Sequence, residues 1–234
     1  MYSPKVLAFI LGFIYALYIY FLFSGNVFYA DAIGSLILPV LTLWYFYNVK
    51  KRSIYLILFL VLHSISDIMI IFSQYMPHYV DYFLGNTLYI LAYLALAIEI
   101  ARKLSVSYIL KHYLFSVIVL FLLNSYITYV LFQIVNSHLL KGAEYVLEIV
   151  YNISMLMILS LALLNYFCKD SRKAFYILVG TVCIVFSEVI NVAYLYVAHQ
   201  NLLNFFTISL GLVGFYFLYE QAKLKYRKQD STIN

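Results

Sequence analysis

Eight long apolar runs constrain this chain more than any other feature of its sequence. A helix needs about 20 mostly apolar residues to cross the hydrocarbon core of a bilayer. Runs of that length lie at roughly 4–23, 30–48, 54–73, 79–100, 109–136, 144–167, 174–197 and 202–222. Of the 234 residues, 65% are hydrophobic and only 11% are charged. We therefore predict an all-α polytopic membrane protein of eight transmembrane helices, with a single transmembrane domain of residues 1–222 and a basic tail of residues 223–234.

The basic residues predict the orientation of the helices. An even number of helices places nearly all of them on one side of the membrane: Lys5, Lys50, Lys51, Arg52, Arg102, Lys103, Lys111, Lys169, Arg172, Lys173, Lys223, Lys225, Arg227 and Lys228. Only Lys141 falls on the other side. Because cytoplasmic loops carry an excess of Lys and Arg, we expect both termini and the tail in the cytoplasm. The net charge of +5 then indicates topology and attraction to anionic lipid headgroups, and no basic surface is large enough to follow a nucleic-acid backbone.

The first run raises the question of processing. It follows Lys5, and Ala30-Asp31-Ala32 resembles a small-residue cleavage site. The run is too long for the core of a signal peptide, so we expect it to be the first helix. The bias toward Ile, Lys, Asn, Tyr and Phe indicates an AT-rich bacterial genome, which favours a bacterial inner (plasma) membrane.

Two carboxylates stand where hydrocarbon is expected. Ser66-Asp67 lies late in the run 54–73, and Ser187-Glu188 lies late in the run 174–197. An ionisable side chain at this depth costs about 3 kcal/mol on insertion scales, so it usually faces the bundle interior and has a function. We expect Asp67 and Glu188 to form the functional centre. Asp31, Asp81 and Glu144 instead lie near helix ends, where capping and the helix dipole favour acids.

The two acids occupy equivalent positions in an internal repeat. Residues 51–102 align without a gap onto residues 172–223, and the rare polar positions coincide: Lys51-Arg52 with Arg172-Lys173, Ser66-Asp67 with Ser187-Glu188, His78 with His199, and Glu99 with Glu220. Four helices in each repeat leave both halves in the same orientation. We therefore predict two parallel repeats, of about residues 1–105 and 106–222, related by an axis along the membrane normal.

Other polar side chains are expected beside the acids. Ser66 and Ser187 adjoin them, while His63 and Asn191 lie about one helical turn away on the same faces. Neighbouring helices supply Asn86, Tyr89, Tyr93, Glu148, Tyr151 and Asn152. These residues predict a polar substrate-binding cavity, although each of them alone could simply hydrogen-bond one helix to another.

Several short motifs resemble the YhhN-type lysoplasmalogenase family of eight-helix membrane proteins. Gly180 to Glu188 resembles its signature of a Gly, a hydrophobic run with a central Phe and a Ser-acid pair, and Leu60 to Met69 resembles the related element of helix 3. Similar elements of other helices are Leu38-Pro39-Val40, Gly85 with Tyr89, and Tyr151 with Met155. The chain departs from the family at Leu38, where Lys is usual, at Tyr93, where His is usual, and at Glu188, where a second Asp is usual.

The resemblance implies hydrolysis of the vinyl ether bond of lysoplasmalogen to a fatty aldehyde and a glycerophospho-headgroup. Protonation of the vinyl carbon gives an oxocarbenium ion, which requires a general acid and a nearby anion that stabilises the cation and activates water. Two carboxylates in an apolar bundle repel each other and are expected to share one proton. We expect one of Asp67 and Glu188 to be the acid and the other the base. The expected partners are a lysophospholipid or other lipid and the membrane, with no cofactor, no metal and no nucleic acid.

Three other hypotheses stay open. A proton-coupled carrier of a small or lipidic substrate also fits duplicated halves with intramembrane acids. A metal hydrolase of the membrane ceramidase type would need clustered imidazoles, but only His63 lies deep, whereas His78, His138 and His199 lie near helix ends. A non-catalytic scaffold or sensor derived from the family would fit the replaced Lys and His. The headgroup preference and the oligomeric state stay open as well.

Overall fold

The computed structural model describes residues 4–139 and 142–224, and their regular elements are helices without any strand. The α-helices are α1 (Pro4–Phe23), α2 (Val27–Gly34), α3 (Ile37–Asn48), α4 (Ile54–Phe72), α5 (His78–Ala101), α6 (Val106–His112), α7 (Leu114–Val135), α8 (Ala143–Lys169), α9 (Arg172–Tyr196) and α10 (Asn201–Lys223). Short 3₁₀ helices follow α4 and α7, at Ser73–Tyr75 and Asn136–His138. Lys141 and residues 225–234 of the basic tail lie outside the described residues.

Eight segments are long and apolar enough to cross a membrane: Lys5–Phe23, Val27–Asn48, Ile54–Tyr75, His78–Ala101, Leu114–His138, Ala143–Lys169, Arg172–Tyr196 and Asn201–Lys223. Each corresponds to one of the apolar runs of the sequence. The prediction of an all-α membrane protein with eight spanning helices is therefore confirmed, and the chain is an integral membrane protein.

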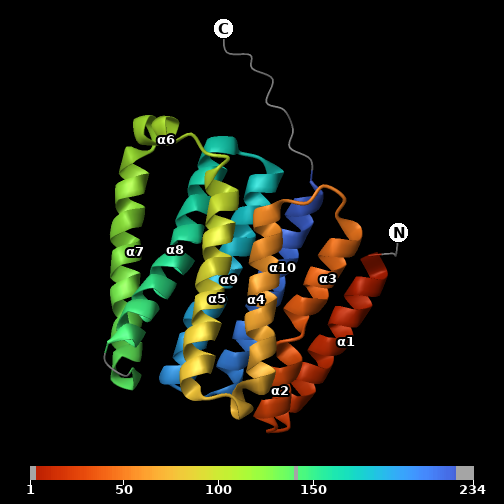
Figure 1. Cartoon of the computed structure of the whole chain (residues 1–234). Helices are drawn as coiled ribbons and strands as arrows, with labels where there is room; N and C mark the ends of the chain where they lie inside the picture. The colour runs from red at the N-terminus through yellow and green to blue at the C-terminus, as the bar shows by residue number, and fades with distance from the viewer. Residues whose placement is uncertain (1–3, 140–141, 225–234) are drawn as a thin grey trace.

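Two of the predicted helices are interrupted. The second span breaks at Ser35 and Leu36 between α2 and α3, and Pro39 lies in the first turn of α3, where a missing N–H removes no helical hydrogen bond. The fifth run divides at Tyr113, and α6 lies across the end of α7 (Figure 1). The exposed Lys111 and His112 of α6 explain this second division, because charged and polar side chains are costly in hydrocarbon.

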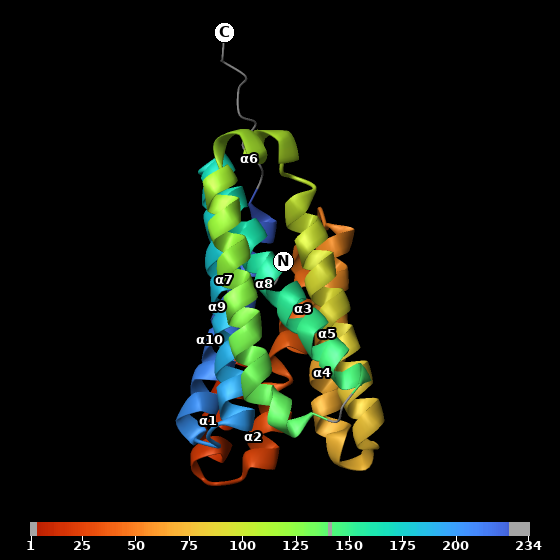
Figure 2. The same ribbon diagram turned by 90° about the vertical axis from the view of Figure 1, so that its left-hand side faces the viewer.

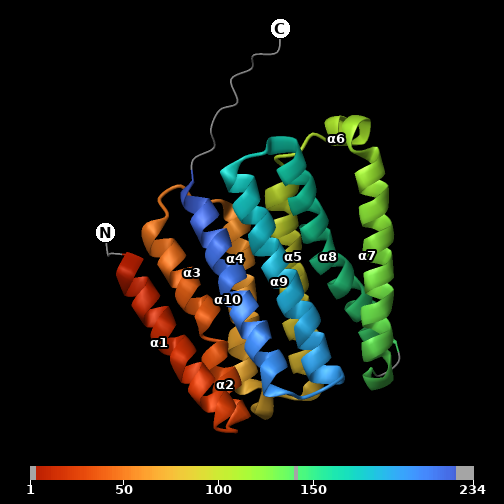
Figure 3. The ribbon, with the colours of Figure 1, turned by 180° about the vertical axis from the view of Figure 1, so that it is seen from behind.

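The centre of the bundle is formed by α4, α5, α8, α9 and α10. The most extensive contacts join α9 to α10 and α4 to α5, while α8 packs against both α5 and α9. α1 lies at one edge and α7 at the other, as the front and back views show (Figures 1 and 3). In the view from the α7 side, α8 crosses obliquely behind α7 (Figure 2). Only Leu131 and Val135 of α7 are buried.

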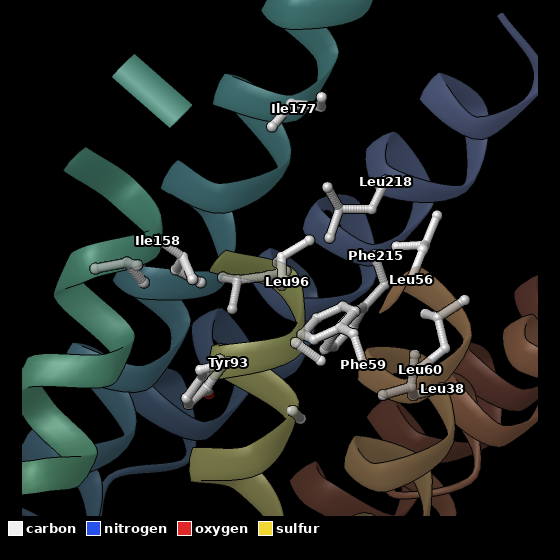
Figure 4. Packing of buried hydrophobic residues seen from close by; sticks show 14 of the residues in the cluster. Leu38, Leu56, Phe59, Leu60, Tyr93, Leu96, Ile158, Ile177, Phe215 and Leu218 are labelled. Carbon is white, nitrogen blue, oxygen red and sulfur yellow. The ribbon is translucent and has the colours of Figure 1, made fainter. Parts of the chain in front are cut away.

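A continuous apolar core joins these helices. Phe59 of α4 packs against Phe215 of α10 with ring centroids 6.0 Å apart, and Leu38, Leu60 and Leu218 surround them (Figure 4). The core holds the inward faces of the helices in a fixed arrangement, so it also sets the positions of the polar side chains beside it.

Charged residues are separated along the long axis of the molecule. The described lysines and arginines lie in the first turn of α1, in the α3–α4, α5–α6 and α8–α9 connections with the helix turns beside them, in α6 and in the last turn of α10. We call this end of the bundle, which carries α6, the basic end (Figure 1). The opposite half, toward the loops at 24–26, 73–77 and 197–200, contains Asp31, Asp67, Asp81, Glu144, Glu148 and Glu188. No described lysine or arginine lies in that half.

Candidate functional site

Asp67 and Glu188 line the same cavity, although they come from α4 and α9 and are far apart in the sequence. The cavity has a volume of about 460 Å³ and lies in the half of the bundle opposite the basic end. Its walls are formed by α2 to α5 and α8 to α10. Of the site residues predicted from the sequence, those that line it are His63, Ser66, Asp67, Asn86, Tyr89, Tyr151, Ser187, Glu188 and Asn191.

Asp67 is positioned by an aromatic side chain and by an imidazole. The hydroxyl of Tyr89 donates a hydrogen bond of 2.8 Å to Oδ1 of Asp67. Nδ1 of His63 lies 3.2 Å from the same oxygen, outside hydrogen-bond geometry. His63 and Asp67 share one face of α4, as their spacing of four residues predicts. Oδ2 of Asp67 has no hydrogen-bond partner among the described residues.

Glu188 is held by two tyrosine hydroxyls. Tyr93 donates to Oε1 at 2.6 Å, and Tyr151 donates to Oε2 at 2.8 Å. Tyr93 does not itself line the cavity, but it is fully buried behind it. Because each carboxylate oxygen has a phenol donor, the orientation of Glu188 is fixed by α5 and α8.

Aromatic contacts connect the two acids. The ring of Tyr151 lies 6.3 Å from that of Tyr89 and 5.7 Å from that of Tyr93, centroid to centroid, both edge to face. The ring of His63 lies 4.7 Å from that of Tyr89. Asp67 and Glu188 therefore belong to one packed polar cluster rather than to two separate sites.

The two serines hold neighbouring helices together. Oγ of Ser66 donates to the carbonyl of Gly85 at 3.0 Å, which joins α4 to α5. Oγ of Ser187 donates to the carbonyl of Thr207 at 2.7 Å, which joins α9 to α10. Their hydroxyl protons are used in these bonds, so their main role is to fix the helices that carry the acids.

Glu148 and Asn152 form a separate group that does not line the cavity. Nδ2 of Asn152 donates to Glu148 Oε1 at 3.1 Å, and the hydroxyl of Tyr82 donates to Oε2 at 3.3 Å. Tyr82 does line the cavity, and Nδ2 of Asn86 donates to its backbone carbonyl at 2.8 Å. Glu148 and Asn152 thus support the cavity wall from behind.

The structure also places Asp31 and Asp81 in the cavity lining. Asp31 was expected to cap a helix, but α2 begins at Val27, so Asp31 lies within the helix. Its Oδ1 accepts a 2.9 Å hydrogen bond from Nδ2 of Asn204, whose Oδ1 accepts one from the hydroxyl of Tyr18 at 3.0 Å. In the sequence, Asp31 and Asn204 each lie inside an apolar run. The second run was predicted to begin at residue 30, three residues after the actual start of α2, so Asp31 was taken for a residue at a helix end.

No three His, Cys, Asp or Glu side chains gather closely enough to bind a metal ion in the described part of the chain. The two carboxylates of the cluster are accompanied by one imidazole and three phenols. These groups provide proton donors, proton acceptors and negative charge, which are the requirements of acid and base chemistry.

Comparisons of the chain with models of protein families, with curated proteins and with solved structures gave no match. Membership of the YhhN-type lysoplasmalogenase family therefore stays a prediction that depends on the short motifs. What the site can do must be inferred from the geometry of its residues.

Proposed function

We propose that this protein is a lysoplasmalogenase-like hydrolase that cleaves the vinyl ether bond of a lysophospholipid to a fatty aldehyde and a glycerophospho-headgroup. The observation that supports it best is that Asp67 and Glu188, from sequence-distant membrane helices, line one cavity. Each also has fixed phenol partners. A pair of positioned carboxylates is suited to protonating carbon on one side and activating water on the other.

In this proposal Asp67 is the general acid and Glu188 is the base. Asp67 transfers its proton to the β-carbon of the vinyl ether, and the negative charge of Glu188 stabilises the resulting oxocarbenium ion. Water attacks the cationic carbon as Glu188 accepts one of its protons. The hemiacetal then breaks down: Glu188 protonates the departing glyceryl oxygen and Asp67 takes the hydroxyl proton, which restores both groups.

The hydrogen bonds support this division of roles. Both oxygens of Glu188 are engaged by Tyr93 and Tyr151, which hold the carboxylate as a fixed negative charge. Asp67 has a partner on Oδ1 only, so Oδ2 is left to carry the proton that moves to the substrate.

We also propose that the two halves of the chain are parallel repeats. Ser66 and Ser187 each donate to a backbone carbonyl of the following helix, and these two helix pairs make the most extensive contacts in the bundle. The aligned Glu99 and Glu220 each form an ion pair with a basic residue three positions later. These matched features support two parallel repeats related by an axis along the membrane normal.

We further propose that the basic end of the bundle faces the cytoplasm. With the basic end in the cytoplasm, both termini lie inside and the cavity lies in the outer half of the membrane. The bacterial plasma membrane is the location that the composition favours.

A proton-coupled carrier is a second candidate, and the interrupted second span favours it. Gly34 and Ser35 at the end of α2, with Ile37 and Leu38 at the start of α3, line the cavity. Discontinuous helices often form the substrate sites of carriers. A carrier would concentrate its substrate in sealed vesicles, whereas the hydrolase would release aldehyde in detergent without any gradient.

The two acids provide the first test. Asp67→Asn and Glu188→Gln should each lower the rate of aldehyde release from lysoplasmalogen by about 100-fold or more, because a positioned acid or base contributes about 10²–10⁴-fold. The purified protein is assayed with an alkenyl lysophospholipid, and aldehyde is quantified directly. Glu220→Gln is the matched control. Glu220 lies at the basic end and does not line the cavity, so this variant should retain full activity. Unchanged turnover in both cavity variants, or no aldehyde from the wild-type protein, would exclude the hydrolase.

A further inference from the structure

The edge helix α1 is joined to α10 by hydrogen bonds between their side chains. The hydroxyl of Tyr18 donates to Oδ1 of Asn204 at 3.0 Å, in the half of the bundle that contains the acids. Nearer the middle of both helices, the hydroxyl oxygens of Tyr15 and Ser209 lie 2.6 Å apart, within hydrogen-bond distance. These bonds fix the distance between the two helices in that half.

Toward the basic end, the same two helices enclose a second cavity with a volume of about 430 Å³, which we call the α1–α10 groove. Leu7 and Leu11 are buried at its floor, whereas Gly12, Val213 and Tyr216 are exposed along its edges. A Cβ on Gly12 would meet no atom within 4 Å. The groove is therefore open space with mostly apolar walls, on a surface that faces lipid.

The end of the groove nearest the basic end carries a surplus of positive charge. Among the described residues that line the groove, Glu220 is the only charged one, and it forms an ion pair with Lys223. Lys5 is exposed in the first turn of α1. The helix α3 contacts both α1 and α10, and the exposed basic residues 50–52 follow its end (Figure 3). Anionic groups are attracted to such a surface.

Two other occupants fit the groove poorly. The chain continues after α10 with Lys225, Arg227, Lys228 and Asp230, and such side chains are costly in an apolar site. A helix of a second copy is about 10–12 Å wide with its side chains, so it would rest on the edges and leave the floor empty. A single acyl chain is narrower and can lie along the buried leucines.

We propose that the α1–α10 groove binds an acyl chain of an anionic phospholipid from the leaflet at the basic end, with the phosphate beside Lys5 and Lys223. Basic sites between membrane helices on the cytoplasmic side are known to hold anionic headgroups. The hydrocarbon chain fills the apolar groove, and the headgroup meets the positive charge at its end. This site is separate from the cavity of Asp67 and Glu188, so it holds for a hydrolase or for a carrier.

A bound lipid should stabilise the protein. It would contact α1 and α10 together in the half where Tyr15 and Tyr18 do not join them. A ligand that binds only the folded state raises the free energy of unfolding. We therefore expect anionic phospholipid to raise the Tm of the wild-type protein in detergent.

Two phospholipids with the same acyl chains test the headgroup. The purified full chain, freed of lipid in neutral detergent, is titrated with dioleoyl phosphatidylglycerol and with dioleoyl phosphatidylcholine, and bound lipid is counted by native mass spectrometry. We expect phosphatidylglycerol to bind at least about fivefold more tightly, as the attraction of one basic residue provides. Equal affinity for the two lipids, or binding of neither, would overturn the proposal.

Filling the groove tests the place of the acyl chain. Gly12→Phe puts a ring into the open space and should weaken phosphatidylglycerol binding by at least about tenfold. It should also remove the rise in Tm. Ile10→Phe is the matched control, because Ile10 is exposed on α1 but does not line the groove. Unchanged binding in Gly12→Phe would overturn the proposal, and so would a wild-type dimer that Gly12→Phe abolishes, since a second copy would then occupy the groove.

Two surface variants test the headgroup contact without changing the groove. Lys5→Gln and Lys223→Gln should each weaken phosphatidylglycerol binding by about fivefold, and neither should affect phosphatidylcholine. Lys111→Gln is the matched control, since Lys111 is exposed at the basic end on α6. Unchanged affinity in both variants would overturn the assignment of the phosphate. None of these results depends on whether the protein releases aldehyde.

Discussion

Three tyrosines define the site at the level of single residues. A buried phenol hydroxyl usually has a hydrogen-bond partner, and here Tyr89, Tyr93 and Tyr151 all direct theirs to the two acids. The sequence suggested these tyrosines as general cavity residues. Their pairing with particular carboxylate oxygens follows from how α4, α5, α8 and α9 pack.

Tyr151→Phe should lower turnover with little effect on folding. The change removes the donor to Oε2 of Glu188 and keeps the ring that packs against Tyr89 and Tyr93. A hydrogen bond to a charged group contributes about 1.5–3 kcal/mol, so we expect a loss of about tenfold or more in aldehyde release. Tyr145→Phe on the same helix is the control. If both variants turn over at the wild-type rate, Tyr151 does not position Glu188.

Two positions differ from the family motifs that the chain resembles, and the structure shows a different environment for each. Tyr93 stands where the family usually has His, and its hydroxyl donates to Glu188, so a hydrogen-bond donor is retained there. Leu38 stands where Lys is usual, and it lines the cavity with an apolar side chain. Position 38 therefore adds no positive charge to the cavity.

At the level of elements, the contact between α9 and α10 depends on two glycines. A Cβ on Gly214 would lie 2.7 Å from Cγ1 of Ile184 and 2.9 Å from the carbonyl oxygen of Gly180. A Cβ on Gly180 would lie 3.0 Å from the carbonyl oxygen of Gly214. The two backbones therefore approach as closely as they do only because both residues lack a side chain, as is common where membrane helices pack.

Gly214→Ala should destabilise the protein by about 1–3 kcal/mol, because an added methyl group in a packed contact forces the helices apart. Thermal unfolding in detergent, followed through Tm, measures the effect. Gly12→Ala on α1 is the control: its Cβ would meet no atom within 4 Å, so Tm should stay the same or rise, since Ala favours helix over Gly. A Tm for Gly214→Ala equal to that of the wild-type protein would mean that the contact between α9 and α10 is looser than described.

The interrupted second span matters to the site as well. The separate helix α2 carries Asp31, which meets Asn204 of α10 beside the cavity. The break at Ser35 and Leu36 places α2 and the start of α3 around the cavity. A local change of chain direction thus adds the carboxylate of Asp31 to the lining of the cavity.

At the level of the whole molecule, charge is divided between the two ends of the bundle. The described lysines and arginines gather at one end, and the cavity with its acids lies in the other half. The positive-inside rule relates the basic end to the cytoplasm, so access to the cavity is expected from the outer side.

Cysteine labelling tests this orientation. In a chain whose Cys168 and Cys183 are replaced by Ser, Ser24→Cys in the loop before α2 should react with a membrane-impermeant maleimide in intact cells. Ser105→Cys, just before α6, should react only after the membrane is permeabilised. Both serines are exposed, so burial does not prevent labelling. The reverse pattern would place the cavity on the cytoplasmic side.

The number of spanning helices and the depth of the two acids were readable from the sequence. The length of an apolar run is a local property that is compared with the thickness of a bilayer, and an acid within such a run is recognised without knowledge of its neighbours. The same local rule did not predict the break at Ser35, because it interrupts a run that stays apolar on both sides. The break at Tyr113 was missed because Lys111 and His112 were included in the fifth apolar run.

Only the tertiary structure decided which helices meet. Lipid chains are as apolar as leucine, so hydrophobicity does not tell a helix face that packs against protein from one that meets lipid. For this reason α7, as apolar as the central helices, lies at the edge, and Glu148 stands behind the cavity wall while Asp31 enters the cavity. The sequence by itself determined that Asp67 and Glu188 lie within membrane-spanning helices. Side-chain packing between distant helices decided that they share one cavity.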